Sequence, residues 1–340
     1  MTFLAEEEQA ARRAKEKPLR LGFVGVGWIG RRRMKALLES GLVEAVAIAE
    51  PAARQVAAAR ELAPSAAVYE DLDELLAGEE LDGVVIATPS ALHVDQAIRA
   101  LEAGLPVFCQ KPMGRTAAEA RQVVEAARRA DRLLAVDMSY RFTEAMRQIR
   151  RRVQEGAIGT VYTADLAFHN AYGPDKAWFY DPRRAGGGCV VDLGIHLIDL
   201  ALWVFDFPAV EAVTSRLFAG GRPLGSPEMQ VEDYAVARLD LAGGTAVRLA
   251  CSWNLPAGQD AVIEAAFYGT EGGLAMRNVD GSFVDFRAER YDGTARRVLV
   301  EPPDAWGGRA AVDWAERLAA RPRYGPVVET YLRGAAVVDA

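Results

Sequence analysis

Residues 185–203 place one histidine and two aspartates after a run of glycines, in the order Ala-Gly-Gly-Gly-Cys-Val-Val-Asp-Leu-Gly-Ile-His-Leu-Ile-Asp-Leu-Ala-Leu-Trp. From Cys189 onward the pattern predicts a helix. Asp192, His196 and Asp199 then share one helical face, because they fall at i, i+4 and i+7. An imidazole beside a carboxylate suits proton transfer near neutral pH. The same spacing also fits a helix that simply displays polar groups.

The residues around these three predict how the helix is held. An apolar stripe beside them indicates that the helix is anchored in a core, and it comprises Leu193, Leu197, Leu200 and Val204. Gly186, Gly187 and Gly188 carry no side chains, so another group can approach the start of the helix closely.

The overall composition is that of a folded protein with about two domains, since the chain has 340 residues. Hydrophobic residues make up 51% of it, enough for a full core, which argues against disorder. The formal net charge is −7 with both signs well mixed. That balance argues against nucleic acid or an anionic membrane as the main partner.

Three cysteines, Cys109, Cys189 and Cys251, are widely spread and give neither a disulfide framework nor a zinc spacing. We therefore expect no metal site and a cytoplasmic location. Met1–Lys17 is charged and lacks the apolar region of a secretion signal, so we expect an N-terminal arm or tail over residues 1–18. No run looks long and apolar enough to span a bilayer.

Strand and helix patterns alternate through the first part of the chain. Leu19–Val26 is apolar and rich in valine, as in a buried strand, and Arg31–Glu39 follows with a helical pattern. The alternation continues as far as Leu133–Met138, which predicts a doubly wound parallel sheet. We assign residues 19–140 to a domain of this type, a Rossmann fold of the α/β class.

Residues 141–340 have a different texture, with strand patterns and glycine turns that predict an α+β domain with a mainly antiparallel sheet. Its predicted strands are Val161–Phe168, Val210–Phe218, Tyr234–Leu241, Thr245–Trp253 and Val262–Tyr268. Helices are predicted over Ala310–Ala320 and Val327–Val338.

A G-x-G-x-x-G motif lies between the first strand and helix, and an acidic residue follows about 20 residues later, as a dinucleotide fingerprint requires. Gly25 gives the tight turn, Gly27 lets the backbone approach a pyrophosphate, and Gly30 allows close packing of helix on strand. Glu50 can accept hydrogen bonds from the ribose hydroxyls and would repel a 2′-phosphate. We therefore expect NAD, with NADP possible because arginines 31–33 and Arg54 are close in the sequence.

Two further motifs follow later strands of the same sheet and face the crevice where such sheets bind ligands. His93, in Thr88-Pro89-Ser-Ala-Leu-His93, either touches the nicotinamide end of the cofactor or is an ordinary residue of the first helical turn. Lys111, in Gln110-Lys111-Pro112, could polarise a hydroxyl or carbonyl oxygen, although alone it also fits a surface lysine.

These motifs, together with Tyr140-Arg141-Phe142 and the glycine-rich helix, occur in one order along the chain. From about Leu19 to its end, the chain resembles the Gfo/Idh/MocA family, the glucose–fructose oxidoreductases, inositol dehydrogenases and their relatives. The resemblance implies a large open sheet in the second domain, one face of which commonly makes a dimer or tetramer contact. It also implies that Lys111, Asp192 and His196 are the catalytic lysine, aspartate and histidine.

One position departs from the family pattern, which usually has Glu-Lys-Pro with the glutamate on the nicotinamide ribose. Gln110 keeps one acceptor oxygen and adds donors, so cofactor binding should survive with altered strength. The full set of expected cofactor contacts is Gly25, Gly27, Trp28, Ile29, Gly30, Glu50, Thr88, Pro89, His93, Gln110 and Lys111.

We expect hydride transfer between NAD(H) and a sugar, inositol or related polyol. His196 would move the hydroxyl proton and Lys111 would stabilise the oxyanion, both over one nicotinamide ring. Aromatic and polar residues suit a sugar ring, and the expected substrate contacts are Tyr140, Asn170, Tyr172, Trp178, Asp192 and His196. Each could instead be a packing residue, and for Arg141 we expect a structural ion pair.

Three other functions fit the same scaffold. An NAD-dependent glycosidase would oxidise, eliminate and re-reduce without net NADH production. A regulator would sense a dinucleotide without catalysis, and a reductase could act on carbonyls other than sugars.

Overall fold

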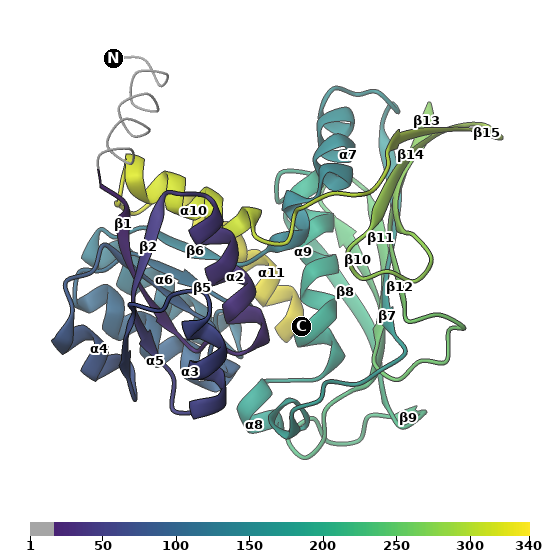
Figure 1. The fold of residues 1–340 in the computed structure, drawn as a ribbon. Helices are drawn as coiled ribbons and strands as arrows, with labels where there is room; N and C mark the ends of the chain where they lie inside the picture. Colours follow the sequence, from purple (N-terminus) through teal and green to yellow (C-terminus); the bar gives the residue numbers. More distant parts are fainter. Residues whose placement is uncertain (1–16) are drawn as a thin grey trace. The chain divides into compact units, whose positions relative to one another are not determined.

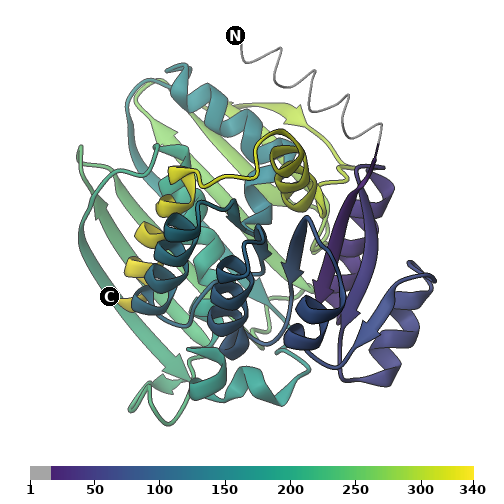
Figure 2. The ribbon, with the colours of Figure 1, turned by 90° about the vertical axis from the view of Figure 1, so that its left-hand side faces the viewer.

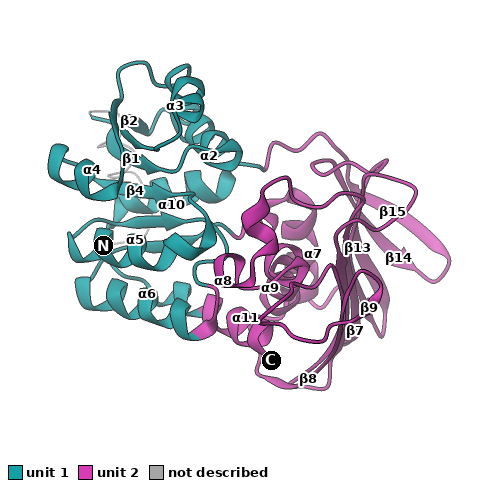
Figure 3. Cartoon of the chain, turned by 90° about the horizontal axis from the view of Figure 1, so that it is seen from below, with its two compact units in different colours: residues 1–114, 118–137, 307–329 teal, residues 115–117, 138–306, 330–340 magenta. Residues whose placement is uncertain are grey.

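The computed structural model describes residues 17–340 (Figure 1). The predicted N-terminal arm or tail therefore lies, up to residue 16, outside the described residues. The chain divides into two compact units (Figure 3). Among the described residues, unit 1 comprises 17–114, 118–137 and 307–329, and unit 2 comprises 115–117, 138–306 and 330–340.

Unit 1 is built on a six-stranded parallel sheet in the order β3-β2-β1-β4-β5-β6. Its strands are β1 Leu19–Val24, β2 Val43–Ala49, β3 Ala67–Tyr69, β4 Gly83–Ile86, β5 Val107–Cys109 and β6 Leu134–Val136. The helices are α2 Trp28–Glu39, α3 Ala53–Arg60, α4 Leu72–Gly78, α5 Ser90–Glu102, α6 Ala117–Ala130 and α10 Arg309–Ala320.

The strand order reverses between β1 and β4, which are neighbours in the sheet (Figure 2). Right-handed crossovers then place the helices after β1 and after β4 on opposite faces. Ligands of such sheets bind beyond the carboxyl ends of the strands at this switch point. The predicted doubly wound α/β fold is confirmed, and its switch point lies at the glycine motif.

Residues 307–329 join unit 1, whereas the sequence prediction assigned all of 141–340 to the second domain. The reason is that α10 packs against α2. Trp314 of α10 is fully buried beside the Phe108 ring of β5, with ring centroids 5.8 Å apart.

Unit 2 contains a nine-stranded sheet in the order β15-β14-β13-β12-β7-β11-β10-β8-β9. Its strands are β7 Val161–Asn170, β8 Val210–Ala219, β9 Arg222–Pro223, β10 Tyr234–Leu241, β11 Ala246–Ser252, β12 Ala261–Gly269, β13 Gly272–Asn278, β14 Phe286–Asp292 and β15 Ala295–Val300. Only β7 and β11 pair in parallel. The predicted mainly antiparallel sheet is confirmed.

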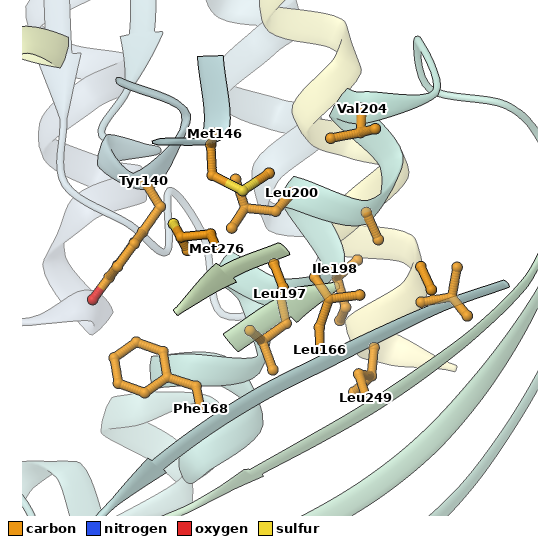
Figure 4. Packing of buried hydrophobic residues seen from close by; sticks show 14 of the residues in the cluster. Tyr140, Met146, Leu166, Phe168, Leu197, Ile198, Leu200, Val204, Leu249 and Met276 are labelled. Atoms are coloured by element: carbon orange, nitrogen blue, oxygen red, sulfur yellow. The ribbon is translucent and has the colours of Figure 1, made fainter. Parts of the chain in front are cut away.

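The helical elements of unit 2 are η1 Ser139–Phe142, α7 Glu144–Gln154, η2 Ala177–Tyr180, α8 Pro182–Ala185, the π-helical turn η3 Val190–Gly194, α9 Ile195–Val204 and α11 Thr330–Asp339. Of these, α7 packs against β13, β14 and β15, and α9 packs against β7 and β11. In Figure 4, Leu197 and Leu200 of α9 lie among core residues that include Leu166 of β7 and Leu249 of β11. The predicted apolar stripe is therefore buried.

The expectation that no run is long and apolar enough to span a bilayer is corrected by residues 182–204. They form a helical stretch that is long and apolar enough, by length and composition, to cross a membrane. Its most apolar window is 78% buried inside the fold, so burial in the core accounts for its composition.

Candidate functional site

The glycine motif forms a tight turn between β1 and α2. Gly25 has φ of 81°, in the left-handed region, and a Cβ there would lie 2.8 Å from the carbonyl oxygen of Ala87. A Cβ on Gly30 would overlap the carbonyl oxygen of Gly25. Only glycine fits either position. Gly27 directly precedes α2, and its carbonyl accepts the first helical hydrogen bond from Arg31 at 3.0 Å.

The two residues that follow Gly27 begin α2. Trp28 is 62% exposed, with the Arg32 guanidinium 4.8 Å from the centre of its ring, and Ile29 is half-buried. The amide groups of this first turn and the helix dipole provide the features that bind a pyrophosphate.

Glu50 directly follows β2 and is held at the same turn. Its carboxylate accepts hydrogen bonds from the backbone amides of Val26 and Ala52, both at 3.1 Å. A carboxylate has about four acceptor positions, so two remain for ribose hydroxyls. The glycine turn and Glu50 together fit a dinucleotide.

The arginines beside this turn have partners within unit 1. Arg31 donates to the Val26 carbonyl at 2.8 Å and to Gln55. Arg33 is buried and pairs with Asp137. These contacts remove Arg33 from the candidates that could receive a 2′-phosphate.

The segment Thr88–Pro89 follows β4, and both residues are half-buried. His93 is only 1% exposed, and its two ring nitrogens lie 2.7 Å from the Pro112 carbonyl oxygen and 2.8 Å from the Thr88 carbonyl oxygen. Burial is the main cause that lowers the pKa of His93. Because both nitrogens face backbone, the ring has no free polar atom for a cofactor, and His93 instead joins two strand-end loops.

Gln110 and Lys111 follow β5. Gln110 is buried and donates its side-chain amide to Asp137, the same carboxylate that pairs with Arg33. Lys111 is half-buried. Asp137 was not predicted from the sequence, because it lies 27 positions beyond Gln110.

In unit 2, Asp192 lies in the π-helical turn and His196 in the first turn of α9. The Asp192 carboxylate accepts a hydrogen bond from the indole N–H of buried Trp253 at 3.1 Å. The His196 ring is buried, and its edge meets the ring of Tyr140 with centroids 4.8 Å apart. The fold thus brings together His196 and the predicted substrate contact Tyr140.

Asp199 was expected to share a face with Asp192 and His196, but it has another role. It is buried and accepts hydrogen bonds from Arg141, one of them at 2.6 Å from Nε. Burial raises the pKa of Asp199, while the Arg141 charge opposes that shift. The predicted ion pair of Arg141 is confirmed, and Asp199 is its partner.

The other predicted substrate contacts lie in or near the segment between β7 and α8. Asn170 ends β7, and its Oδ1 is buried without a hydrogen-bond partner among residues 17–340. Tyr172 is exposed and donates its hydroxyl to Asp260. The Trp178 ring stacks on Phe179, with centroids 3.8 Å apart. Tyr172 and Trp178 thus contact Asp260 and Phe179, respectively.

The chain matches two family models that together cover most of this structure. Residues 19–138 match the oxidoreductase family with an NAD-binding Rossmann fold, and residues 146–275 match the Gfo/Idh/MocA C-terminal domain. The chain belongs to the Gfo/Idh/MocA family of oxidoreductases, as its motifs predicted.

Named relatives give the same assignment. The rhizopine catabolism protein MocA of Rhizobium meliloti is 33% identical over 70% of this chain and 73% of its own length. D-Glucoside 3-dehydrogenase of Escherichia coli strain K12 is 28% identical over 76% of this chain and 77% of its own. Among solved structures, levoglucosan dehydrogenase with NADH and levoglucosan has a TM-score of 0.82 at 22% identity, covering 95% of this chain and 96% of that one.

Proposed function

We propose that this oxidoreductase transfers a hydride between the nicotinamide of NAD(H) and a carbinol or carbonyl carbon of a sugar, inositol or related polyol. The names of its relatives support that substrate class, since they include a glucoside dehydrogenase and a levoglucosan dehydrogenase. We assign cofactor binding to residues 19–140, and substrate binding and oligomer contacts to residues 141–306 and 330–340.

His196 carries this proposal, because its imidazole is buried against the Tyr140 ring, and Asp192, four positions before it in the chain, is held by Trp253. Bound NAD supplies the hydride acceptor, and NADH the hydride donor. In oxidation His196 removes the hydroxyl proton, and in reduction it returns that proton. Lys111 stabilises the oxyanion that develops on the same oxygen, and Asp192 orients His196 or the substrate.

The choice between NAD and NADP is argued from Glu50, which directly follows β2. The Glu50 carboxylate lies where an adenosine ribose would be bound, and its charge would repel a 2′-phosphate. Arg33, Arg31 and Arg32 are engaged with Asp137, Gln55 and the Trp28 ring. This arrangement favours NAD over NADP.

A substrate panel tests the proposed function. Polyols, aldoses and nucleotide sugars are each assayed for NADH absorbance, with NAD and with NADP. We expect at least one sugar or polyol to be oxidised with NAD in preference to NADP. Tight NAD binding without any turnover would contradict the proposal and favour a regulator. Cleavage of a glycoside without net NADH would favour a glycosidase.

A further inference from the structure

Three consecutive backbone amides at the start of the helix that carries Asp192 and His196 donate to one residue, Glu232. The amides of Gly188 and Val190 donate to its carboxylate Oε1 at 2.9 and 2.8 Å. The amide of Cys189 donates to its backbone carbonyl at 3.0 Å. Glu232 lies just before β10 and is 5% exposed.

Gly188, the last glycine before the helix, is explained by the same residue. A Cβ on Gly188 would lie 1.9 Å from the carbonyl oxygen of Glu232, whereas a Cβ on Gly187 would first meet the Val191 side chain, at 2.6 Å. The group that approaches Gly188 closely is therefore the backbone of Glu232.

The chemistry of a helix start explains what Glu232 contributes. The first four amides of a helix have no partner within it, and Glu232 accepts hydrogen bonds from three of them. A carboxylate is also favoured there by the helix dipole. Burial raises the pKa of Glu232, and its backbone donors oppose that shift.

The segment that contains Glu232 also holds Trp253, the residue that donates a hydrogen bond to Asp192. The carbonyl of Asp233 accepts a hydrogen bond from the backbone amide of Trp253 at 2.8 Å. The indole of Trp253 in turn donates to Asp192 at 3.1 Å. One short segment thus fixes both the helix start and the group that holds Asp192.

We propose that Glu232 is a positioning residue, which sets the placement of Asp192 and His196 through the start of their helix. The expected effect of Glu232 on kcat rests on the proposed function. It also makes a structural claim that does not need turnover, namely that Glu232 protects the amides of Gly188, Cys189 and Val190.

The test compares E232A, E232Q and the control E289A. Glu289 is also a buried carboxylate of unit 2, but it lies on β14 and accepts a hydrogen bond from Tyr291. Three quantities are measured for each full-length variant: kcat, KM for NAD, and amide hydrogen exchange of residues 186–192.

In E232A we expect Asp192 and His196 to be misplaced by roughly 1 Å, which lowers kcat about 100-fold. KM for NAD should change little. Exchange should accelerate at the three amides. E232Q keeps an acceptor oxygen and loses only the negative charge that the helix dipole favours. Its kcat should therefore stay within about threefold of wild type. E289A should change neither kcat nor exchange at these amides.

The proposal is overturned if E232A keeps kcat and exchange like wild type, or if E289A loses as much kcat as E232A. If the wild type turns over no substrate, the proposed function fails, and exchange at the three amides alone decides the positioning claim. If E232A does not fold, E232D is used instead. Its carboxylate is one methylene shorter and should fail to reach both amides.

Discussion

Gln110 is oriented by Asp137, which directly follows the neighbouring strand β6. Its side-chain amide donates to Asp137, and Asp137 also pairs with Arg33 in a buried site. Because the amide nitrogen faces Asp137, the side-chain oxygen faces away from it and can serve as the acceptor for a ribose hydroxyl. A glutamate here would place two carboxylates together in this buried site.

We predict that Q110E weakens cofactor binding more than it slows turnover. The second carboxylate repels Asp137, which should raise Kd for NADH by about tenfold, while kcat at saturating cofactor stays within about threefold. Fluorescence titration of NADH measures the affinity. The double variant Q110E/D137N removes the repulsion and should regain affinity. A large fall in kcat at saturating cofactor would refute this account.

At this scale, the glycine turn could be predicted from the sequence, whereas the distant partners of the proposed site residues could not. Lys111, Asp192 and His196 stand in a recognisable pattern. Trp253 hydrogen-bonds to Asp192 from 61 positions away in the chain, and Glu232 accepts a hydrogen bond from Gly188, which is 44 positions away. No local periodicity encodes such a contact, because it depends on how strands are ordered in the sheet.

The loops after β4 and β5 are joined by the ring of His93, which lies between the carbonyl groups of Thr88 and Pro112. Burial lowers the pKa of His93 below its ordinary value of 6.5. The hydrogen bonds to the two carbonyl groups oppose that shift, and the nearby Lys111 charge adds to it. The folded protein therefore holds the imidazole neutral at a pH where the unfolded chain already binds a proton.

We predict that His93 makes stability depend on pH. Its contribution is complete above the unfolded pKa of 6.5 and is lost as the pH falls through the lower folded pKa. The free energy of unfolding of wild type and H93N is measured in urea at about pH 8 and about pH 5.5. The wild type should exceed H93N by about 1 kcal/mol at the higher pH, the worth of a buried hydrogen bond, and should lose that advantage at the lower. An advantage that is equal at both values contradicts the prediction.

Strands in which apolar and polar residues alternate clearly were predicted well. β10 has the predicted bounds, Tyr234–Leu241, because buried and exposed side chains alternate along much of it. β13 begins with two glycines, and β15 carries two adjacent arginines, so neither showed a strand pattern. The π-helical turn at Val190–Gly194 could not be predicted from 3.6-residue spacing, and it changes the helical register between Asp192 and Asp199, which pairs with Arg141.

The nine-stranded sheet of unit 2 buries one face under its helices and exposes side chains on the other. Val236 of β10 is 41% exposed, next in the chain to buried Ala235. We propose, from the family resemblance, that this open face joins subunits into a homodimer or homotetramer.

We predict that V236R converts the oligomer to monomer, because an arginine buried at an interface without a partner costs several kcal/mol. Sedimentation velocity measures the assembly. V68R places the same charge on exposed β3 of unit 1 and should leave the oligomer intact. A wild-type monomer, or a V236R protein that assembles normally, would contradict the proposed contact.

The proposal that Lys111 and His196 act on one substrate oxygen is tested most directly by the turnover of K111A. We predict a kcat lower by about 10²–10³-fold with NAD affinity retained, because one preorganised charge donor is lost at the developing oxyanion. K35A, on an exposed lysine of α2, should match wild type in both measurements. Wild-type turnover in K111A would remove Lys111 from the mechanism and contradict the account.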